Sequence, residues 1–524
     1  MNWRHYLLLA LIGLIVSGTI ASFQSVPGYM DADYYYAGGL QLAAGRGFTE
    51  PYLWNYLDDP AGLPHASHAY WMPLASILAA LVPALSGHLT WFAARLPFIL
   101  AAALIPPLTS ALAFSITSRR DLAIISGFLA VFSGYYAPFL PLTDTFSLYM
   151  LFGALFFLVG RRQSAAGSLA LGVIVGFMHL SRADGILWLL LALLASIVHR
   201  PSRCVYKKSL ITHHSSLVSL ALAGYLLIMS PWLVRNLAVF GTPLAPGGSR
   251  ALWLTGYNQL FAYPASQLTF AAWWQSGLAE ILKERLWALG LNLESAFAVQ
   301  GNIFLLPFIL IGVWQLRRES RTCLALLAWG LTLAVMTLVF PFAGARGGFF
   351  HSGAALQPFW WAVAPLGLER LVAWGARRRG WPEKQAFTVF SAGLVGIAAL
   401  LTALIVQGRV IGQLNGEPAW GREASAYSQI EEFLEKQGAP VEAVVILANP
   451  PGYYLASGRP AVAIPDGDEQ TVLQLAGRYG GRYLILEQGS LPDALAALYA
   501  RPDRHPNFRY LGEVEEARIY AIQP

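Results

Sequence analysis

The chain has few charged residues and almost no cysteine. Only 12% of its 524 residues are Asp, Glu, Lys or Arg, against about 25% in a typical soluble domain. The two cysteines, Cys204 and Cys323, lie far apart, so the sequence implies no disulfide framework. It also contains no glycine-rich nucleotide loop, no Cys/His cluster with metal-ligand spacing and no nucleophile elbow. These absences argue against a soluble domain, a disulfide scaffold and the enzyme classes that carry those motifs.

Long apolar runs are what the sequence has instead. Hydrophobic residues make up 56% of the chain, and a helix needs about 20 mostly apolar residues to cross the hydrocarbon core of a bilayer. The sequence therefore predicts a polytopic α-helical membrane protein with about 11–13 transmembrane helices. Residues 72–86 are short and contain two prolines, so they are interpreted as either a broken span or an interfacial helix. The eleven predicted spans are 6–23, 97–117, 122–140, 145–160, 165–181, 185–199, 215–233, 300–315, 323–341, 352–372 and 386–408.

The positions of the basic residues predict the membrane topology of the chain. Clusters of Lys and Arg fall at every second junction between the predicted spans, as the positive-inside rule requires of cytoplasmic loops. The net charge of +6 is therefore interpreted as topology and not as nucleic-acid binding. We expect residues 1–20 to be a retained signal anchor, and the long loops 24–71 and 236–299 to be external. The clusters lie at 119–120, 161–162, 200–208, 317–321 and 377–384.

The composition becomes that of a soluble protein after about residue 410. We therefore predict a membrane domain over 1–410 and an extracytoplasmic α/β domain over 415–524. Apolar periodicity within the second domain predicts three helices, three strands and a closing hairpin over 508–522. The predicted helices are 424–436, 468–478 and 491–500, and the predicted strands are 442–447, 461–464 and 482–487.

Asp31 and Asp33 follow the first apolar run within a few residues. Carboxylates beside a membrane span are costly unless they are paired, hydrated or used in chemistry. If the segment is extended, both point to one face and could act together as a base and its orienting group, or as metal ligands. The alternative is a pair of solvated loop acids.

Further polar residues stand at the ends of later spans. Asp144 begins one span and is a candidate catalytic acid or a helix N-cap. Arg182 and Asp184 are candidates for phosphate binding, because the guanidinium fork suits phosphate, or for a surface ion pair. Arg235 and Arg346 are candidates for the same role or arginines that snorkel to headgroups.

His65 and His68 precede the ambiguous segment 72–86 and are spaced three apart. On a helix such a pair could share a ligand. Two histidines alone make a poor metal site, so interfacial hydrogen bonding is the favoured interpretation. We assign both to candidate substrate or phosphate binding, and the metal ligands stay unknown.

These motifs, in this order, resemble the GT-C superfamily of polytopic glycosyltransferases, which includes protein O-mannosyltransferases, aminoarabinose transferase and oligosaccharyltransferases. The resemblance rests on Met30-Asp31-Ala32-Asp33-Tyr34-Tyr35, Gly45-Arg46-Gly47-Phe48, Tyr70-Trp71-Met72-Pro73-Leu74, Asp144, Arg182 and Pro231-Trp232-Leu233-Val234-Arg235-Asn236. Two features depart from it: Ala32 separates acids that are usually adjacent, and the Trp-Trp-Asp signature of oligosaccharyltransferases is missing.

The resemblance implies a membrane glycosyltransferase. Such enzymes move a sugar from a polyprenyl-phosphate donor to a lipid, glycan or protein acceptor on the outer face of the membrane. Asp31 or Asp33 would be the general base, the arginines would bind the phosphate, and Asp144 would orient the acceptor or complete a metal site. No cofactor is assigned and a divalent cation is left open; nucleic acid is not expected as a partner.

We expect the protein in a bacterial plasma membrane with its active site facing outside. Two other classes stay open: a transporter or flippase of a lipid-linked sugar, and a non-catalytic membrane assembly protein.

Overall fold

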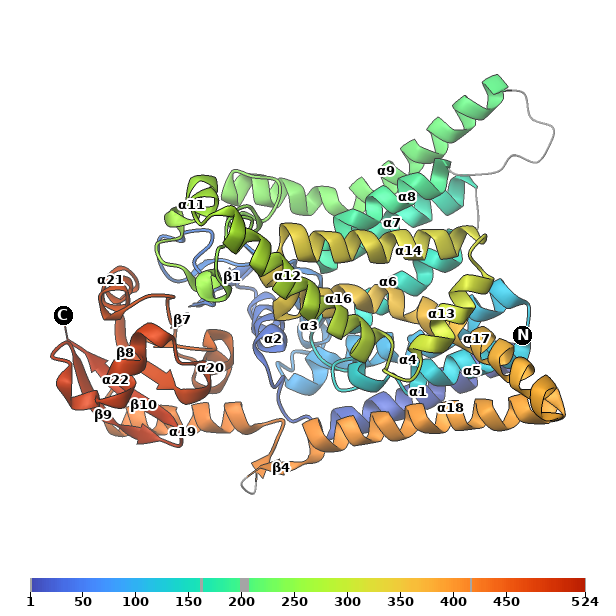
Figure 1. Ribbon diagram of the computed structural model, residues 1–524. Helices are drawn as coiled ribbons and strands as arrows, with labels where there is room; N and C mark the ends of the chain where they lie inside the picture. The colour runs from blue at the N-terminus through green and yellow to red at the C-terminus, as the bar shows by residue number, and fades with distance from the viewer. Residues whose placement is uncertain (1, 161–163, 198–206, 415–416, 524) are drawn as a thin grey trace. The chain divides into compact units, whose positions relative to one another are not determined.

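The computed structural model describes residues 2–160, 164–197, 207–414 and 417–523 (Figure 1). The predicted basic residues at 161–162 and 200–206, with Cys204, lie outside the described residues. The described chain divides into two compact units. Unit 1 comprises residues 1–23, 95–235 and 284–411, and unit 2 comprises residues 24–94, 236–283 and 412–524.

Long apolar helices confirm the polytopic α-helical membrane fold. Five helical stretches are long and apolar enough to cross a membrane: Trp3–Ser22, Trp91–Thr117, Ser215–Phe240, Ser320–Val339 and Glu383–Ile411. Five shorter apolar helices accompany them: Leu74–Ser86, Phe146–Val159, Ala165–Ser181, Ala183–Ser196 and Leu306–Gln315.

Unit 1 is built from helices and short helical turns in the part of it that the structure describes. Its main helices are α1 (Trp3–Ser22), α4 (Trp91–Thr117), α5 (Arg120–Val131), α6 (Phe146–Val159), α7 (Ala165–Ser181), α8 (Ile186–Ile197), α9 (Lys207–Phe240), α12 (Leu278–Ser295), α13 (Leu306–Gln315), α14 (Ser320–Ala334), α16 (Phe349–Gly353), α17 (Gln357–Arg379) and α18 (Glu383–Val406). The first residues of α4 and α12 and the last residues of α9 belong to unit 2.

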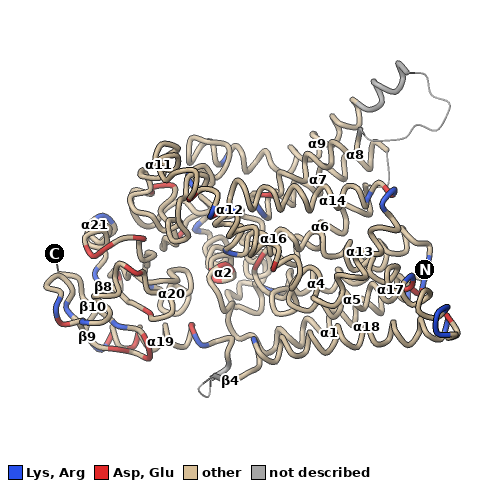
Figure 2. The backbone as a smooth tube through the Cα atoms, in the orientation of Figure 1, with Lys and Arg blue, Asp and Glu red and all other residues tan. Residues whose placement is uncertain are grey.

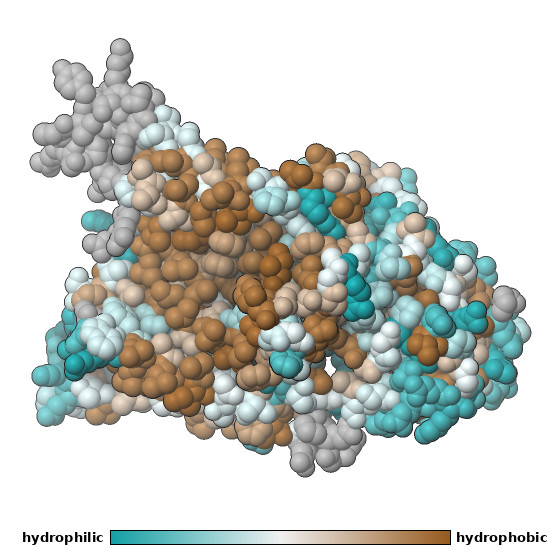
Figure 3. Space-filling view, turned by 180° about the vertical axis from the view of Figure 1, so that it is seen from behind, coloured by the Kyte–Doolittle hydropathy of each residue, from teal (hydrophilic) through white to brown (hydrophobic). Residues whose placement is uncertain are grey.

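The surface of unit 1 suits a lipid environment. Many of its exposed side chains are large and apolar, including Leu7, Leu11, Leu100 and Leu404. The space-filling view shows hydrophobic residues over a broad area of one face (Figure 3). Basic residues gather instead at the turn between α17 and α18 (Figure 2).

Glycines allow the helices of unit 1 to pack closely. A Cβ atom at Gly367 of α17 would lie 1.9 Å from the carbonyl oxygen of Phe308, near the start of α13. A Cβ at Gly172 of α7 would lie 1.9 Å from the carbonyl oxygen of Ala221 on α9. Small residues of this kind let backbones approach in membrane proteins, where no hydrophobic effect drives helix association.

Unit 2 contains a mixed six-stranded sheet in the order β2-β7-β6-β8-β10-β9. The strands β2, β7, β6 and β8 run parallel, and β10 pairs antiparallel with β8 and β9. The strands are β2 (Tyr52–Leu53), β6 (Val444–Leu447), β7 (Ala461–Ala463), β8 (Gly481–Glu487), β9 (Phe508–Val514) and β10 (Ala517–Ile522). Strand β2 comes from the predicted external loop 24–71, so this loop forms part of the same unit as the C-terminal residues.

Helices cover the sheet. Helix α19 (Arg422–Lys436) buries Tyr427, Ile430 and Leu434 in one apolar cluster with β6 and β10. Helix α21 (Glu469–Tyr479) buries Val472 and Leu475 in another, with β7 and β8. The predicted C-terminal α/β fold is therefore confirmed. The short helices α20 (Pro450–Ser457) and α22 (Ala496–Ala500) complete it.

The N-terminal part of unit 2 presents the acidic motif. Helix α2 (Met30–Ala43) packs against α3 (Leu74–Ser86), where a Cβ at Gly39 would lie 2.7 Å from the Cβ of Ala79. The two-stranded pair β1 (Thr49–Glu50) and β3 (His65–Ala66) lies between these helices in sequence. The ambiguous segment 72–86 is thus a helix of unit 2 with Pro83 inside it. The short helices α10 (Gly247–Ala251) and α11 (Phe270–Gln275) come from the second predicted loop.

Candidate active site

Asp31 and Asp33 lie in the first turn of helix α2. The extended conformation that would place both on one face does not occur, because residues two apart on a helix differ in direction by about 200°. Asp31 is partly exposed, whereas Asp33 is buried, with only 6% of its surface exposed. Both carboxylates suit the positive end of the helix dipole. The structure therefore distinguishes two acids that the sequence left equivalent.

Asp33 is held by the C-terminal part of unit 2. Asn449 Nδ2 donates to Asp33 Oδ2 at 2.9 Å and to Glu423 Oε1 at 3.1 Å. Asn449 is placed as the N-cap of α20, where its Oδ1 accepts from the Gly452 amide. Helix α2 is therefore joined to α19 and α20 through one amide side chain.

Three carboxyl groups of unit 2 share a poorly solvated environment. Burial raises the pKa of Asp33 well above its usual range, the charge of Glu423 adds to the shift, and the Asn449 hydrogen bond opposes it. Burial also raises the pKa of Glu423. The pKa of Glu487 rises to about 7, chiefly through burial and further through the charge of Glu423. Tyr427 OH lies 2.9 Å from Glu423 Oε1 and 3.2 Å from Glu487 Oε1.

Neither His65 nor His68 lies on a helix, so the helical spacing that could give them a shared ligand does not occur. His65 belongs to β3, where its Nδ1 lies 3.4 Å from Glu50 and its Nε2 lies 3.5 Å from Asp58. His68 is buried, stacks on Tyr35, and its Nδ1 lies 3.2 Å from the carbonyl oxygen of Trp71. The two side chains therefore have different environments within unit 2.

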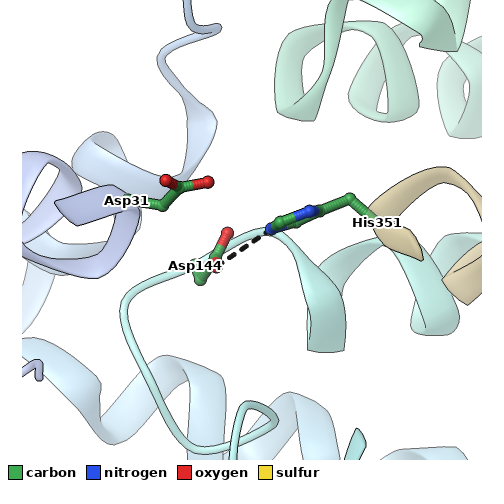
Figure 4. Close-up of side chains that lie close together, drawn as sticks. All are labelled: Asp31, Asp144 and His351. Carbon is green, nitrogen blue, oxygen red and sulfur yellow. Dashed lines mark hydrogen bonds and ion pairs between the residues drawn. The ribbon is translucent and has the colours of Figure 1, made fainter. Parts of the chain in front are cut away.

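Asp144 contacts a histidine in unit 1 that the sequence did not suggest. His351 Nε2 lies 3.3 Å from Asp144 Oδ2 (Figure 4), and only 1% of Asp144 is exposed. The other ring nitrogen of His351 lies 2.9 Å from the carbonyl oxygen of Gly347, which fixes the orientation of the ring. Phe146 stacks on that ring with centroids 4.0 Å apart. The N-cap of α6 is Thr145, and the Thr145 amide donates to Asp144 Oδ1 just before the helix.

Arg182 and Asp184 form the ion pair that the sequence offered as one alternative. Arg182 Nε lies 2.9 Å from Asp184 Oδ1, and both side chains are largely buried. Tyr149 OH donates to Asp184 Oδ2 at 3.1 Å, and Arg182 Nη2 donates to the carbonyl oxygen of Gly348 at 3.4 Å. The segment 347–351 therefore contacts both Asp144 and Arg182, and the guanidinium has a defined orientation.

The remaining two candidate arginines have different settings. Arg235 stacks over Trp232, with its Cζ atom 4.7 Å from the ring centroid. Such a contact holds the guanidinium against an aromatic face. Arg346 is half-buried in a π-helical turn, next to Gly347, whose φ of 106° only glycine adopts readily.

Four residues of these clusters were not predicted as site residues from the sequence: His351, Glu423, Asn449 and Glu487. The Pro-Pro pair after Asn449 is a helix-start signal that could have predicted its capping role. Nothing local marks the other three, because their partners lie far away in the sequence. His351 and Asp144, for example, are separated by 207 residues.

Comparisons with known proteins identify the fold. No protein-family model matches the chain, and no curated protein matches its sequence. Among solved structures, the apo oligosaccharyltransferase of Archaeoglobus fulgidus is similar with a TM-score of 0.57 and 12% identity, over 92% of this chain and 69% of that one. ArnT from Cupriavidus metallidurans is similar with a TM-score of 0.55 and 13% identity, over 98% of this chain and 97% of that one.

Another structure of the archaeal enzyme, AglB, contains an inhibitory peptide and a dolichol-phosphate. It has a TM-score of 0.56 and 13% identity, over 92% of this chain and 69% of that one. At such low identity these similarities concern the fold. The resemblance to GT-C glycosyltransferases is confirmed at that level.

Proposed function

We propose that this chain, which has the fold of AglB and ArnT, is a membrane glycosyltransferase. It moves a sugar from a polyprenyl-phosphate donor to an acceptor on the extracytoplasmic face. The observation that carries the proposal is the buried Asp144–His351 pair of unit 1, within a fold shared with glycosyltransferases. The complex of AglB with a dolichol-phosphate supports a lipid-phosphate donor for that fold.

Asp31 is the preferred general base. A base must reach the proton of the acceptor hydroxyl or amine, and Asp31 is the more exposed of the two acids in the motif. Asp33 is engaged by Asn449 inside unit 2, which suits a group that positions helix α2. In this assignment Asp31 is the general base and Asp33 positions helix α2.

Arg182 is the preferred phosphate ligand among the candidate arginines. Its orientation is set by Asp184 and the Gly348 carbonyl, so less entropy is lost when an anion binds. Arg346, beside Gly347 and Gly348, is the second candidate. Stabilising the phosphate as its charge develops lowers the barrier for departure of the leaving group.

Asp144 and His351 would hold a divalent cation. A carboxylate oxygen and an imidazole nitrogen suit zinc and manganese, and the ring orientation of His351 is set by the Gly347 carbonyl. A related structure of the archaeal oligosaccharyltransferase is a complex with Zn and sulfate. When bound, such an ion would supply positive charge to the leaving phosphate.

Sugar transfer from a polyprenyl-phosphate donor in isolated membranes tests the proposal. We expect Asp31→Asn to lower the rate by roughly 10²–10⁴-fold, the usual contribution of a general base. Asp144→Asn and His351→Gln should lower it as well. Asp121→Asn is the matched control, because Asp121 is an exposed acid of unit 1 paired with Arg119. Full activity of the Asp31→Asn, Asp33→Asn double variant would refute the catalytic assignment.

A further inference from the structure

A pocket of about 260 Å³ lies within unit 2, between the chain entering α2 and the helices α19 and α20. This volume is far above the 10–15 Å³ that one water needs and just below the usual range for small-molecule sites. Asp33 and Glu423 contribute carboxylates to its wall, and Tyr36, Trp91 and Tyr427 contribute rings. The pocket is thus large enough for a small organic ligand.

The charged residues in the wall of the pocket determine which ligand charge is favoured. None of the described residues that line the pocket is Lys, Arg or His, while two of them are acids. An anion would be repelled by these carboxylates in a setting from which much of the water is excluded. A cation would interact favourably with both.

The hydrogen bonds around the acids also favour a positively charged ligand. Asn449 donates one N–H to Asp33 and one to Glu423, and the single proton of Tyr427 OH faces both Glu423 and Glu487. Glu487 also accepts from the backbone N–H of Ala448. None of the three acids forms an ion pair in the described part of the chain. A positive ligand would stabilise the ionised form of these acids against the neutral form that burial favours.

The aromatic part of the wall selects an organic cation over a metal ion. Tyr36 and Trp91 meet edge to face with centroids 5.1 Å apart, and the Trp91 indole is fixed by its hydrogen bond to the Gln24 carbonyl. Aromatic faces attract ammonium groups, and aliphatic side chains such as Leu455 suit a short alkyl chain. Magnesium and calcium ions prefer six or more oxygen ligands, which this partly apolar wall does not present.

We propose that this pocket binds a small organic cation with a primary ammonium group. The ammonium group lies between Asp33 and Glu423, and its alkyl part packs on the rings and Leu455. The site is separate from the glycosyl transfer proposed above, because it involves neither Asp31 nor the Asp144–His351 pair. Its occupation would stiffen the junction of α2 with α19 and α20.

Binding of propylammonium chloride to the purified full-length protein in detergent tests the proposal. Saturation-transfer NMR of the propyl protons would follow binding, with 1-propanol as the neutral analogue and no sugar donor present. We expect saturable binding of propylammonium and none of 1-propanol. Equal binding of both compounds, or binding of Mg²⁺ in place of propylammonium, would overturn the proposal.

Variants locate the bound cation. Glu423→Gln should weaken binding at least tenfold, while Glu435→Gln, an exposed acid on the same helix, should leave it unchanged. Ala456→Phe keeps both carboxylates but fills the pocket from an exposed position on its wall, so it should also abolish binding. Unchanged binding in Ala456→Phe, with the thermal unfolding of the protein preserved, would place the ligand elsewhere and reject the site.

Discussion

Replacing Glu487 by Gln should make unit 2 more stable at pH 8 than the wild-type chain. Glu487 ends strand β8, and burial raises the pKa of its carboxyl from 4.5 to about 7. Glutamine has nearly the same shape and can still accept from Tyr427 OH, but it never ionises. The substitution therefore removes the cost of a buried charge and keeps the contact.

Proton linkage gives the direction in which the folding stability changes with pH. Between pH 4.5 and about 7 the folded state holds a proton on Glu487 that the unfolded state has released, so stability falls as pH rises through this window. A shift of about 2.5 pH units corresponds to about 3 kcal/mol at 1.36 kcal/mol per unit. The Gln variant should match the wild type near pH 4.5 and exceed it by about 3 kcal/mol at pH 8.

Hydrogen exchange of the full-length protein measures this difference. Peptides covering α19 and β8 should exchange on the order of 10²-fold more slowly in the variant at pH 8, after correction for the intrinsic exchange rate. Glu435→Gln, on the exposed side of α19, should show no such change. Identical pH dependence in Glu487→Gln and the wild type would show that Glu487 ionises normally and would refute the reasoning.

Three further outcomes test other parts of the structure. Arg459→Met should destabilise unit 2 by about 3–5 kcal/mol in denaturant unfolding, because it leaves Glu431 without the partner now 2.7 Å away; near-wild-type stability would contradict this. Gly367→Ala should cost about 1–3 kcal/mol and speed thermal inactivation, because its Cβ would meet the Phe308 carbonyl, whereas Gly375→Ala, with open space around it, should not. A reporter enzyme fused after Pro524 should be active outside the cell, and cytoplasmic activity would reverse the proposed orientation.

Much of the fold could be predicted because the signals are local. Apolar runs indicate membrane helices whatever their neighbours are, and alternating or helical periodicity located most elements of the C-terminal domain to within a few residues. Strand β2 was not predicted, because two residues in a long loop carry no periodic signal. It forms only because β7 offers an edge for pairing.

The candidate residues were predictable as chemical types and not as contacts. The ion pair of Arg182 with Asp184 could be proposed from the sequence, because the two residues are two positions apart. The assignment of Asp31 and Asp33 to one face failed because it assumed an extended segment, and the segment is helical. The pairing of His65 with His68 assumed a helix, and His65 lies in a strand.

The sequence alone determined that this is a polytopic membrane protein with a small α/β domain and acids beside its first span. These properties depend on composition and short-range periodicity, which are independent of the rest of the chain. Tertiary structure alone decided that His351 meets Asp144, and that Asn449 and Glu423 enclose Asp33 from more than 380 residues away. Such contacts depend on how distant helices pack, and it is this packing that separates Asp31 from Asp33 by burial.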